Sequence, residues 1–349
     1  MDDVLIECVP NFSEGRNHET IDKIKDAILS VSGVTLLDID IGFDFNRTVV
    51  TMVGTPDSIL KAAVESSKVA FELIDMQKHS GEHARMGAVD VVPFIPLANA
   101  SMDLCTEIAI KYANEISSEC NVPVYLYGEA ASKKDRILLP NIRKGEYEGF
   151  SAKIIQKNWI PDFGKPEFNP ISGVTASGSR NMLIAYNVNL DTNNKSLANI
   201  IAGKIRTSGI IKKDINGEKI FDDNGKPLKI PGKFKYLQAA GWMFDKNTAQ
   251  VSMNLLNYEY TGLHQVMESI ESEAENLGLK VLASELVGLG PLEAFLDAGK
   301  YYSSKERELP QKKLIEIAVE KLKLNVIERF IPEDKIIELT LLKNEEGTI

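Results

Sequence analysis

Residues 34–53 read VTLLDIDIGFDFNRTVVTMV and predict two consecutive strands, Val34–Ile41 and Arg47–Val53. The loop between them contains Gly42 and Asn46, residue types that favour turns. Two strands in succession, with no helix between them, form the middle of a βαββαβ unit when a helix lies on each side. The sequence around this pair therefore decides the fold.

Apolar residues recur with helical spacing on both sides of the pair. They run through His18–Val31 before it and through Ile59–Ile74 after it, where Pro56 favours a helix start. Strand-like runs at Val4–Val9 and Val89–Ile95 complete the order β-α-β-β-α-β, which is that of the ferredoxin-like unit. A further helix and a further strand extend it, at Met102–Cys120 and Val122–Tyr127.

The second half of the chain repeats this order without repeating the residues. Its elements are expected, in chain order, at Met182–Leu190, Ser196–Thr207, Tyr236–Phe244, Gln250–Asn257, Leu263–Leu277 and Lys280–Leu286. The sequence thus predicts an α+β fold, an α/β sandwich of two ferredoxin-like βαββαβ subdomains. We place the subdomains at residues 1–179 and 180–302, with a charged C-terminal extension at residues 303–349.

The stretch Lys204–Lys235 is basic and contains nine lysines or arginines against four acids. Asn-Gly pairs beginning at Asn216 and Asn224 are typical turn signals, so we expect an inserted surface hairpin at about residues 209–233. The tail after residue 303 has apolar residues on one helical face. We expect it to form a solvated helix packed against the body.

Composition excludes several classes of protein. The length of 349 residues suits two domains, and the net charge of −10 argues against a general nucleic-acid surface. Cys8, Cys105 and Cys120 are widely spaced without a CxxC pair, which indicates a reducing compartment. The N-terminus lacks the apolar run of a signal peptide, and no stretch approaches a membrane span. We expect a cytoplasmic protein with no membrane partner.

The stretch KHSGEHARMGAVD, residues 78–90, contains two of the four histidines of the chain. Its two glycines give the loop backbone freedom, and a histidine such as His83 in this setting suits proton transfer near neutral pH. Ordinary surface histidines are the simpler alternative. A metal site would need a third ligand, for which His18 and His264 are candidates only by default, so we expect no metal.

Two more polar loops follow predicted strands. The loop NFSEGRN, residues 11–17, includes Asn11, and the loop DIDIGFDFNRT, residues 38–48, includes Asp40 and Arg47. A carboxylate such as Asp40 can orient a histidine or raise its pKa. Turn formation alone is the alternative explanation for these residue types.

The stretch PDFGKPEFNPISGVTASGSRN, residues 161–181, lies at the expected domain junction. A flexible linker is one interpretation. Its aromatic residues and Arg180 favour a ligand site instead, because junctions between domains often bind ligands. Phe163 and Phe168 can stack on a flat ring, and Arg180 can pair with a carboxylate.

Together these stretches resemble the glutamate formiminotransferase, or glutamate formimidoyltransferase, family. The segments that carry the resemblance are ECVPNFSEGRN, NRTV, LIDMQKHSGEHARMGAVDVVPFIP, VPVYLYGEAA, IRKGEYE, PDFG and LVGLGPL, in this order. They extend from Leu5 to about Asp297, and GEHARMGAVDV is the most specific of them. The basic insert and the charged tail depart from the family pattern. The resemblance implies a stand-alone transferase without the cyclodeaminase domain to which many members are fused.

The resemblance implies an activity as well. The family transfers a formimino group between N-formimino-L-glutamate and tetrahydrofolate, giving 5-formiminotetrahydrofolate and L-glutamate, in histidine degradation. Tetrahydrofolate then acts as a cosubstrate, with no metal, and the protein is expected to be a homodimer with small-molecule partners and no nucleic acid. The implied fold has a ligand tunnel between the two subdomains.

The resemblance also implies the site residues. The catalytic histidine of the family corresponds to His83, and its acidic partner corresponds to Asp40, whereas His79 is expected to be structural. Candidates for the carboxylates of glutamate are Arg47, Arg85 and Arg180. The expected substrate-binding residues are Asn11, Arg47, Arg180 and the folate segment formed by Gly164, Lys165, Pro166, Glu167, Phe168, Asn169, Pro170, Ile171, Ser172 and Gly173.

Three alternatives stay open at this point. A formyl donor, handled as in folate salvage with 5-formyltetrahydrofolate, differs from a formimino donor by a single atom. A folate-binding module without transfer activity would need no titrating group in the GEH loop. A purely structural role for the duplicated fold leaves the polar loops unexplained.

Overall fold

The computed structural model describes residues 4–82, 84–303 and 309–346. The chain divides into two compact units, Met1–Asn181 and Met182–Ile349. Each unit has its own main sheet and its own hydrophobic core.

The first unit is built on a seven-stranded sheet. Its strands are β1 (Leu5–Cys8), β2 (Asn11–Phe12), β3 (Val34–Gly42), β4 (Arg47–Gly54), β5 (Val89–Ala98), β6 (Val124–Gly128) and β7 (Thr175–Ser179). Both β1 and β2 pair antiparallel with β4 and β5, and β3 pairs with β4. This pairing is the ferredoxin-like arrangement, which confirms the predicted fold class. Parallel pairing of β7 with β5 and β6 extends the sheet.

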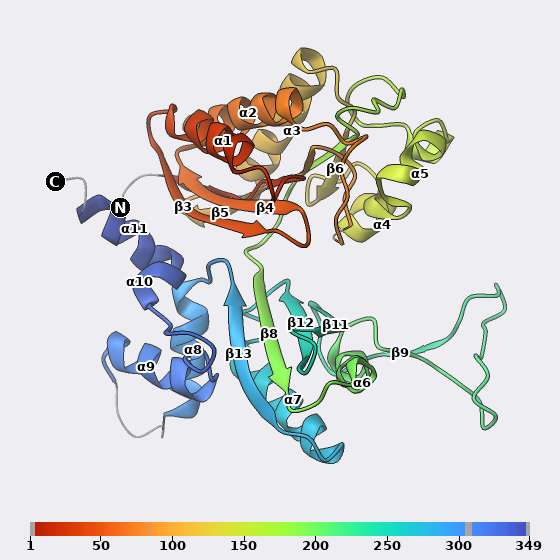
Figure 1. Ribbon diagram of the computed structural model, residues 1–349, viewed down its shortest axis with the longest axis vertical. Coiled ribbons are helices and arrows are strands. Elements are labelled where there is room, and N and C mark those ends of the chain that lie inside the picture. Colours follow the sequence, from red (N-terminus) through yellow and green to blue (C-terminus); the bar gives the residue numbers. More distant parts are fainter. Residues whose placement is uncertain (1–3, 83, 304–308, 347–349) are drawn as a thin grey trace. The chain divides into compact units, whose positions relative to one another are not determined.

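Three helices cover one face of this sheet: α1 (His18–Leu29), α2 (Pro56–Leu73) and α3 (Met102–Glu119) (Figure 1). The N-termini of α1 and α3 are capped by side chains, because Asn17 accepts hydrogen bonds from two backbone N–H groups and Ser101 accepts one. The apolar sides of all three helices pack against the strands and form the larger core of the unit.

The opposite face is covered over β6 and β7 by α4 (Leu139–Arg143) and α5 (Glu146–Lys153). The short 3₁₀ turns Lys134–Arg136 and Lys157–Trp159 flank these helices. No helix of the first unit packs over β1–β4 on this side in the described part of the core. We call this part the helix-free face; by strand register it carries Glu7, Asn11, Asp38, Asp40, Arg47, Val49 and Thr51.

Strand β7 was not predicted from the sequence. It lies inside the sheet, between β5 and β6, although its sequence TASGS has no apolar alternation. Two buried hydroxyls explain how polar residues fit there. Ser177 donates to the carbonyl of Ala109 (2.9 Å), and Ser179 shares a hydrogen bond of 2.6 Å with Thr106, so both are satisfied by α3.

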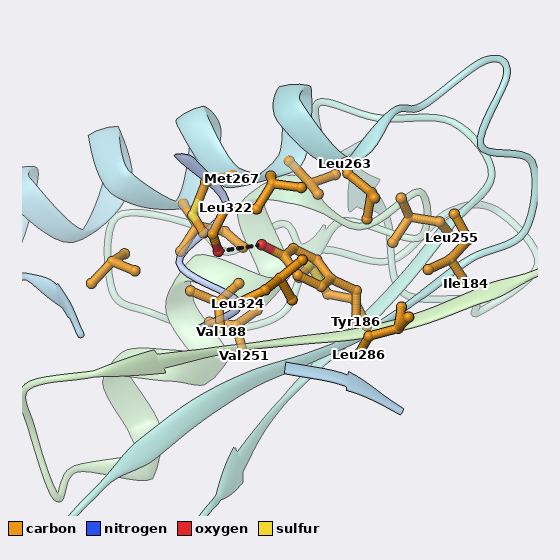
Figure 2. Packing of buried hydrophobic residues seen from close by; sticks show 14 of the residues in the cluster. Ile184, Tyr186, Val188, Val251, Leu255, Leu263, Met267, Leu286, Leu322 and Leu324 are labelled. Atoms are coloured by element: carbon orange, nitrogen blue, oxygen red, sulfur yellow. Dashed lines mark hydrogen bonds between the residues drawn. The ribbon is translucent and has the colours of Figure 1, made fainter. Parts of the chain in front are cut away.

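The second unit repeats the βαββαβ order with a four-stranded antiparallel sheet. Its elements are β8 (Ile184–Leu190), α6 (Lys195–Ile205), β11 (Leu237–Met243), β12 (Ala249–Leu255), α7 (Leu263–Asn276) and β13 (Val281–Val287), with strand order β11-β12-β8-β13. Figure 2 shows the apolar side of this sheet, where Tyr186 packs among aliphatic side chains and donates a hydrogen bond of 3.2 Å to the carbonyl of Leu322.

An insert between α6 and β11 projects away from this sheet (Figure 1). It starts and ends with the paired strands β9 (Ile210–Ile211) and β10 (Lys229–Ile230). Two tight turns lie between them, and each contains a glycine with positive φ, Gly217 and Gly225. Both Asn-Gly signals in the sequence therefore mark turns.

The C-terminal elements are α8 (Leu292–Tyr302), α9 (Gln311–Lys321), α10 (Pro332–Lys335) and α11 (Ile337–Glu346). Ile315, Ala318 and Val319 of α9 are buried in the same core as the sheet of the second unit. No helix within the described residues is both long enough and apolar enough to cross a membrane.

Candidate active site

Three predicted site residues lie on the helix-free face. Cross-strand pairing places one row of residues across six strands: Asp40, Val49, Asn11, Val91, Ala176 and Tyr125. Asp40 and Asn11 both pair with Val49, on opposite sides of β4. Arg47 lies on the same face at the start of β4, opposite Gly42. The structure therefore brings Asp40, Asn11 and Arg47 to one side of the sheet.

A β-bulge shapes the edge of this site. Phe12 pairs with Val89, and the preceding Asn11 pairs with Val91, so Asp90 is the extra residue on β5. At the bulge Asp90 is not paired with a residue of β2, so its carboxylate does not follow the side-chain alternation of the strand. One oxygen accepts a hydrogen bond of 2.9 Å from the backbone N–H of Met86, and the other pairs with Arg143 of α4. Asp90 thereby links the loop before β5 to α4.

The loop before β5 lies beside the predicted folate segment. Gly87 and Gly173 face each other in an antiparallel bridge, and the Val174 N–H donates to the Met86 carbonyl (3.1 Å). The Ala88 N–H donates to the Ser172 carbonyl (2.9 Å). The histidine loop and the predicted folate segment therefore share backbone hydrogen bonds.

Close approach of these two segments requires glycine. A Cβ atom on Gly87 would collide with the backbone of Val174 and Ser172. Gly173 has φ +68°, a left-handed conformation, and a Cβ atom there would collide with the Met86 carbonyl.

Asn46 connects the loops after β2 and β3 to the histidine loop. Its own φ is +49°, a value that asparagine tolerates better than most residues. Its side-chain oxygen accepts from the Gly15 N–H (2.9 Å), and its amide nitrogen donates to the Ser80 carbonyl (3.0 Å). One side chain thus ties three loops together.

His79 is held in one neutral tautomer. The Arg85 guanidinium can only donate, so Nδ1 of His79 accepts its hydrogen bond (3.3 Å), and Nε2 donates to the Asn46 carbonyl (2.8 Å). Burial lowers the pKa of His79, and the charge of Arg85 acts in the same direction. Both ring nitrogens bind protein atoms, which agrees with a structural role.

Arg85 is engaged by acidic side chains of α5. It makes a bidentate pair with Glu148, with distances of 3.0 and 2.6 Å, and a further contact of 3.2 Å with Glu146. These contacts raise the pKa of Arg85, chiefly through the hydrogen bond to Glu148. The sequence made Arg85 a candidate for a substrate carboxylate, but in the structure it anchors the histidine loop to α5.

Arg143 is a site residue that the sequence analysis did not single out. It pairs with buried Asp90. The pKa of Arg47 is lowered to about 10, chiefly by burial and next by the positive charge of Arg143. Asp90 and Asp40 oppose that shift, so the four charged groups lie within electrostatic reach of one another. The segment IRKGEYE contained the signal, since Arg143 is its second residue.

Arg180 follows β7 on the same sheet. Its backbone N–H donates to the Phe94 carbonyl (3.3 Å). The Arg180 side chain also reaches the Tyr127 hydroxyl. Burial raises the pKa of Tyr127, whereas the charge of Arg180 and a hydrogen bond from Arg180 lower it. Arg180 and Arg143 both act on Tyr127, so the third predicted site arginine belongs to the same cluster of charges.

The folate segment Gly164–Gly173 begins exposed and ends buried. Gly164–Glu167 are exposed, whereas Ser172 and Gly173 are buried. The Phe168 ring packs on Tyr147 of α5 with centroids 5.2 Å apart. The Ser172 hydroxyl is buried without a hydrogen-bond partner among the described residues. The Phe168 ring therefore contacts another ring of the protein, and the turn at the end of the segment contains an unsatisfied hydroxyl.

The expected catalytic residue, His83, lies outside the described residues. Its neighbours in sequence are placed: the Glu82 N–H donates to the Asp44 carbonyl (3.4 Å), and Arg85 is held by Glu148. Within the described ranges, no group of three or more His, Cys, Asp or Glu side chains could hold a metal ion.

Family models match nearly the whole of both units. The model of the formiminotransferase domain, N-terminal subdomain, matches residues 5–180, and that of the formiminotransferase domain matches residues 185–342. These matches cover both ferredoxin-like halves, including β7, α9 and most of α11.

Individual proteins agree with this assignment. Glutamate formimidoyltransferase of Streptococcus pyogenes is 42% identical over 85% of this chain and 93% of its own length. The protein of the same name from Thermoplasma acidophilum is 40% identical over 85% of this chain and 92% of its own. Formimidoyltransferase-cyclodeaminase of Rattus norvegicus is 46% identical over 96% of this chain, which spans 59% of that relative. This chain therefore belongs to the formiminotransferase family.

Proposed function

We propose that the protein transfers a formimino group between N-formimino-L-glutamate and tetrahydrofolate, giving 5-formiminotetrahydrofolate and L-glutamate. The observation that supports this most is the backbone pairing of Gly87 with Gly173, which joins the histidine loop to the expected folate segment. The helix-free face also contains a guanidinium group, Arg47, that can pair with a carboxylate of a substrate with two carboxylates.

We assign proton transfer to His83. N5 of tetrahydrofolate attacks the formimino carbon and loses its proton to the imidazole, and a bond from carbon to N5 forms. The imidazolium then returns the proton to the glutamate nitrogen as the bond from carbon to that nitrogen breaks. Asp40 stabilises the charged ring in this scheme. Acid–base assistance of this kind contributes about 10²–10⁴-fold to the rate.

Substrate binding falls to two groups of residues. Arg47 and Arg180 pair with the carboxylates of the glutamate moiety, since guanidinium groups bind carboxylates with two parallel hydrogen bonds. Asn11 and the segment Gly164–Gly173 contact folate. The pairing of Arg85 with Glu148 leaves Arg85 as the anchor of the histidine loop.

The test is a transfer assay with tetrahydrofolate as acceptor and with the formimino and formyl donors offered in parallel. We expect His83→Ala to lose at least about 100-fold in kcat on the formimino donor. His18→Ala, at the exposed first position of α1, is the matched control and should keep wild-type rates. Turnover of His83→Ala within about tenfold of wild type would rule out the acid–base role. Activity with the formyl donor alone would mean that the protein transfers a formyl group in place of the formimino group.

A further inference from the structure

An arm formed by residues 210–230 projects from the second unit (Figure 1). It is the insert that starts with β9 and ends with β10, and its residues lie outside the hydrophobic cores of the described chain. Its large exposed apolar side chains are Ile210, Ile211, Ile215, Phe221, Leu228 and Ile230. A cluster of exposed apolar residues typically marks an interaction surface.

The first turn of the arm presents an isoleucine in a fixed position. Ile215 is 100% exposed. The carboxylate of the preceding Asp214 accepts two hydrogen bonds of 2.9 Å from backbone N–H groups of the same turn, which orders it. Lys213 and Lys219 lie opposite each other at the base of the turn. A preordered apolar tip between two lysines loses little conformational entropy when it docks.

The arm is basic in a chain whose net charge is −10. It carries five lysines against four acids, and among the described residues none of the five takes part in an ion pair; they are Lys212, Lys213, Lys219, Lys226 and Lys229. A surface that complements the arm must therefore be apolar and also carry acidic groups.

A groove with this chemistry lies on the same unit, between α9, α10 and α11. Its volume is about 800 Å³. The apolar lining includes Ile315, Val319 and Phe330, which are buried, and Val326, which is 61% exposed. The groove is therefore open to solvent and large enough to hold several side chains of another segment.

Glutamates predominate among the charged residues that line the groove. Glu316 and Glu320 lie one turn apart on α9, and Glu333 lies on α10. All three are exposed, and Glu320 and Glu333 form no ion pair with a described residue. Of the two lysines in the lining, Lys323 pairs with Glu271 outside the groove (3.0 Å). This charge distribution favours a lysine-bearing apolar segment over an anionic ligand.

The arm and the groove lie at opposite edges of one sheet. The arm leaves beside the edge strand β11, where the Thr207 N–H donates to the Leu237 carbonyl (2.9 Å). The groove lies beyond the other edge strand, β13, where the Ser284 N–H donates to the Lys323 carbonyl (3.1 Å). Figure 1 shows the arm projecting away from α9 and α10. The occupant of the groove must therefore come from another molecule, and every copy of this chain has such an arm.

We propose that the arm of one copy docks in the groove of a second copy. Ile215 enters the apolar part of the groove, and the lysines of the arm lie beside Glu316, Glu320 and Glu333. Each copy has one arm and one groove, so two copies that exchange arms about a two-fold axis satisfy both contacts and close as a dimer. This inference concerns surfaces of the second unit and does not depend on the proposed function.

Sedimentation velocity of the full chain over a range of concentrations tests the proposal. We expect a wild-type dimer that dissociates more readily at high salt, because salt screens the contacts between lysine and glutamate. Ile215→Asp should raise the dimer dissociation constant at least about tenfold, since an apolar contact is replaced by a carboxylate facing glutamates. Ile155→Asp is the matched control at a 72% exposed isoleucine of the first unit, and it should dimerise like wild type.

A groove variant tests the other side of the contact. Glu316→Lys with Glu320→Lys should also weaken the dimer at least about tenfold. An equal mixture of this variant with Ile215→Asp should form heterodimers, because the intact arm of the first meets the intact groove of the second. Adding Lys213→Glu and Lys219→Glu to the groove variant reverses the charges on both sides and should restore at least about threefold of the lost affinity.

Thermal melts show whether each variant is folded, and Ile215→Ser, with an expected loss of at least about threefold, replaces Ile215→Asp if the latter is not. A wild type that stays monomeric at every concentration would overturn the proposal. Self-association that is unchanged in both the arm and the groove variants would also overturn it, since the contact would then lie elsewhere. Absence of heterodimers from the mixture, or no gain from the charge reversal, would exclude the pairing of arm with groove.

Discussion

Gly87 and Gly173 lie opposite each other in an antiparallel bridge, 86 positions apart in the sequence. The bridge fixes the end of the histidine loop against the end of the folate segment. It is reinforced on both sides by the hydrogen bonds from Ala88 to Ser172 and from Val174 to Met86. The relative position of the two segments is thus set by backbone atoms and depends on residues without side chains.

We expect Gly173→Ala to destabilise the protein by roughly 2–4 kcal/mol. Its φ of +68° disfavours any side chain, and the added Cβ would collide with the Met86 carbonyl. Gly149→Ala is the matched control, because Gly149 lies inside α5 with no atom near the added Cβ. The control should be neutral or more stable by up to about 1 kcal/mol. Denaturant unfolding of both variants checks this, and equal stability would contradict the strain argument.

The ion pair of Asp90 with Arg143 gives a second prediction. The Asp90 side chain is 2% exposed and that of Arg143 is 17% exposed. Asp90→Asn should therefore cost about 3 kcal/mol of unfolding free energy, because it leaves a largely buried guanidinium without its counter-charge. In the double variant Asp90→Asn with Arg143→Met, the cost should be smaller than the sum of the single costs by about 1–3 kcal/mol.

A double-mutant cycle measured by urea unfolding gives this coupling energy. Strict additivity would mean that the two side chains do not interact in solution. Asp162 with Arg136, a second buried pair of the first unit that lies away from the histidine loop, is a suitable comparison for stability. Only the Asp90 pair should also change transfer rates, since only Asp90 binds the Met86 N–H.

Periodicity in the sequence predicted the elements that bury an apolar stripe. The pair Val34–Gly42 and Arg47–Gly54, with α1 and α2 around it, formed as expected. Strand β7 escaped prediction because its burial depends on Ser177 and Ser179 finding partners on α3, about seventy residues earlier. Such hydroxyl pairs leave no local pattern.

The loops of the candidate site could be predicted from the sequence, but the side-chain contacts that connect them could not. The motifs around Asn11, Asp40 and His83 were visible in the sequence, and register places the first two on one face. The pairs of Arg85 with Glu148 and of Asp90 with Arg143 join residues 63 and 53 positions apart. No spacing rule predicts such contacts, so the sequence indicated neither the pairing of Arg85 with Glu148 nor the place of Arg143 beside Asp90.

Acid should weaken the fold through His79. Burial lowers its pKa in the folded protein below the unfolded value of about 6.5. Between these two values the unfolded chain binds more protons, so the unfolding free energy falls as the pH falls below about 6.5. His79→Gln keeps an N–H donor for the Asn46 carbonyl and cannot titrate. We expect the variant to lose less stability than wild type between about pH 7.5 and about pH 5.

Unfolding curves at the two pH values check this expectation. His264 also has a pKa lowered by burial, and it remains in the variant, so the acid sensitivity should shrink without vanishing. An unchanged pH dependence in His79→Gln would show that His79 is not held neutral.

Lys153 carries the last prediction, because it fixes the turn that presents Arg143. Its ammonium donates to the carbonyls of Asn141 (3.1 Å), Ile142 (2.5 Å) and Lys144 (2.9 Å), which flank Arg143. Lys153→Met keeps the length of the side chain and removes all three donors, so we expect a loss of roughly 2–4 kcal/mol in unfolding free energy. Lys157→Met, at an exposed position of the following 3₁₀ turn, should stay within about 0.5 kcal/mol of wild type.

If Lys153 positions Arg143, the coupling energy between Asp90 and Arg143 should also fall when the double-mutant cycle is repeated in the Lys153→Met variant. An unchanged coupling energy would mean that Lys153 stabilises only the turn itself.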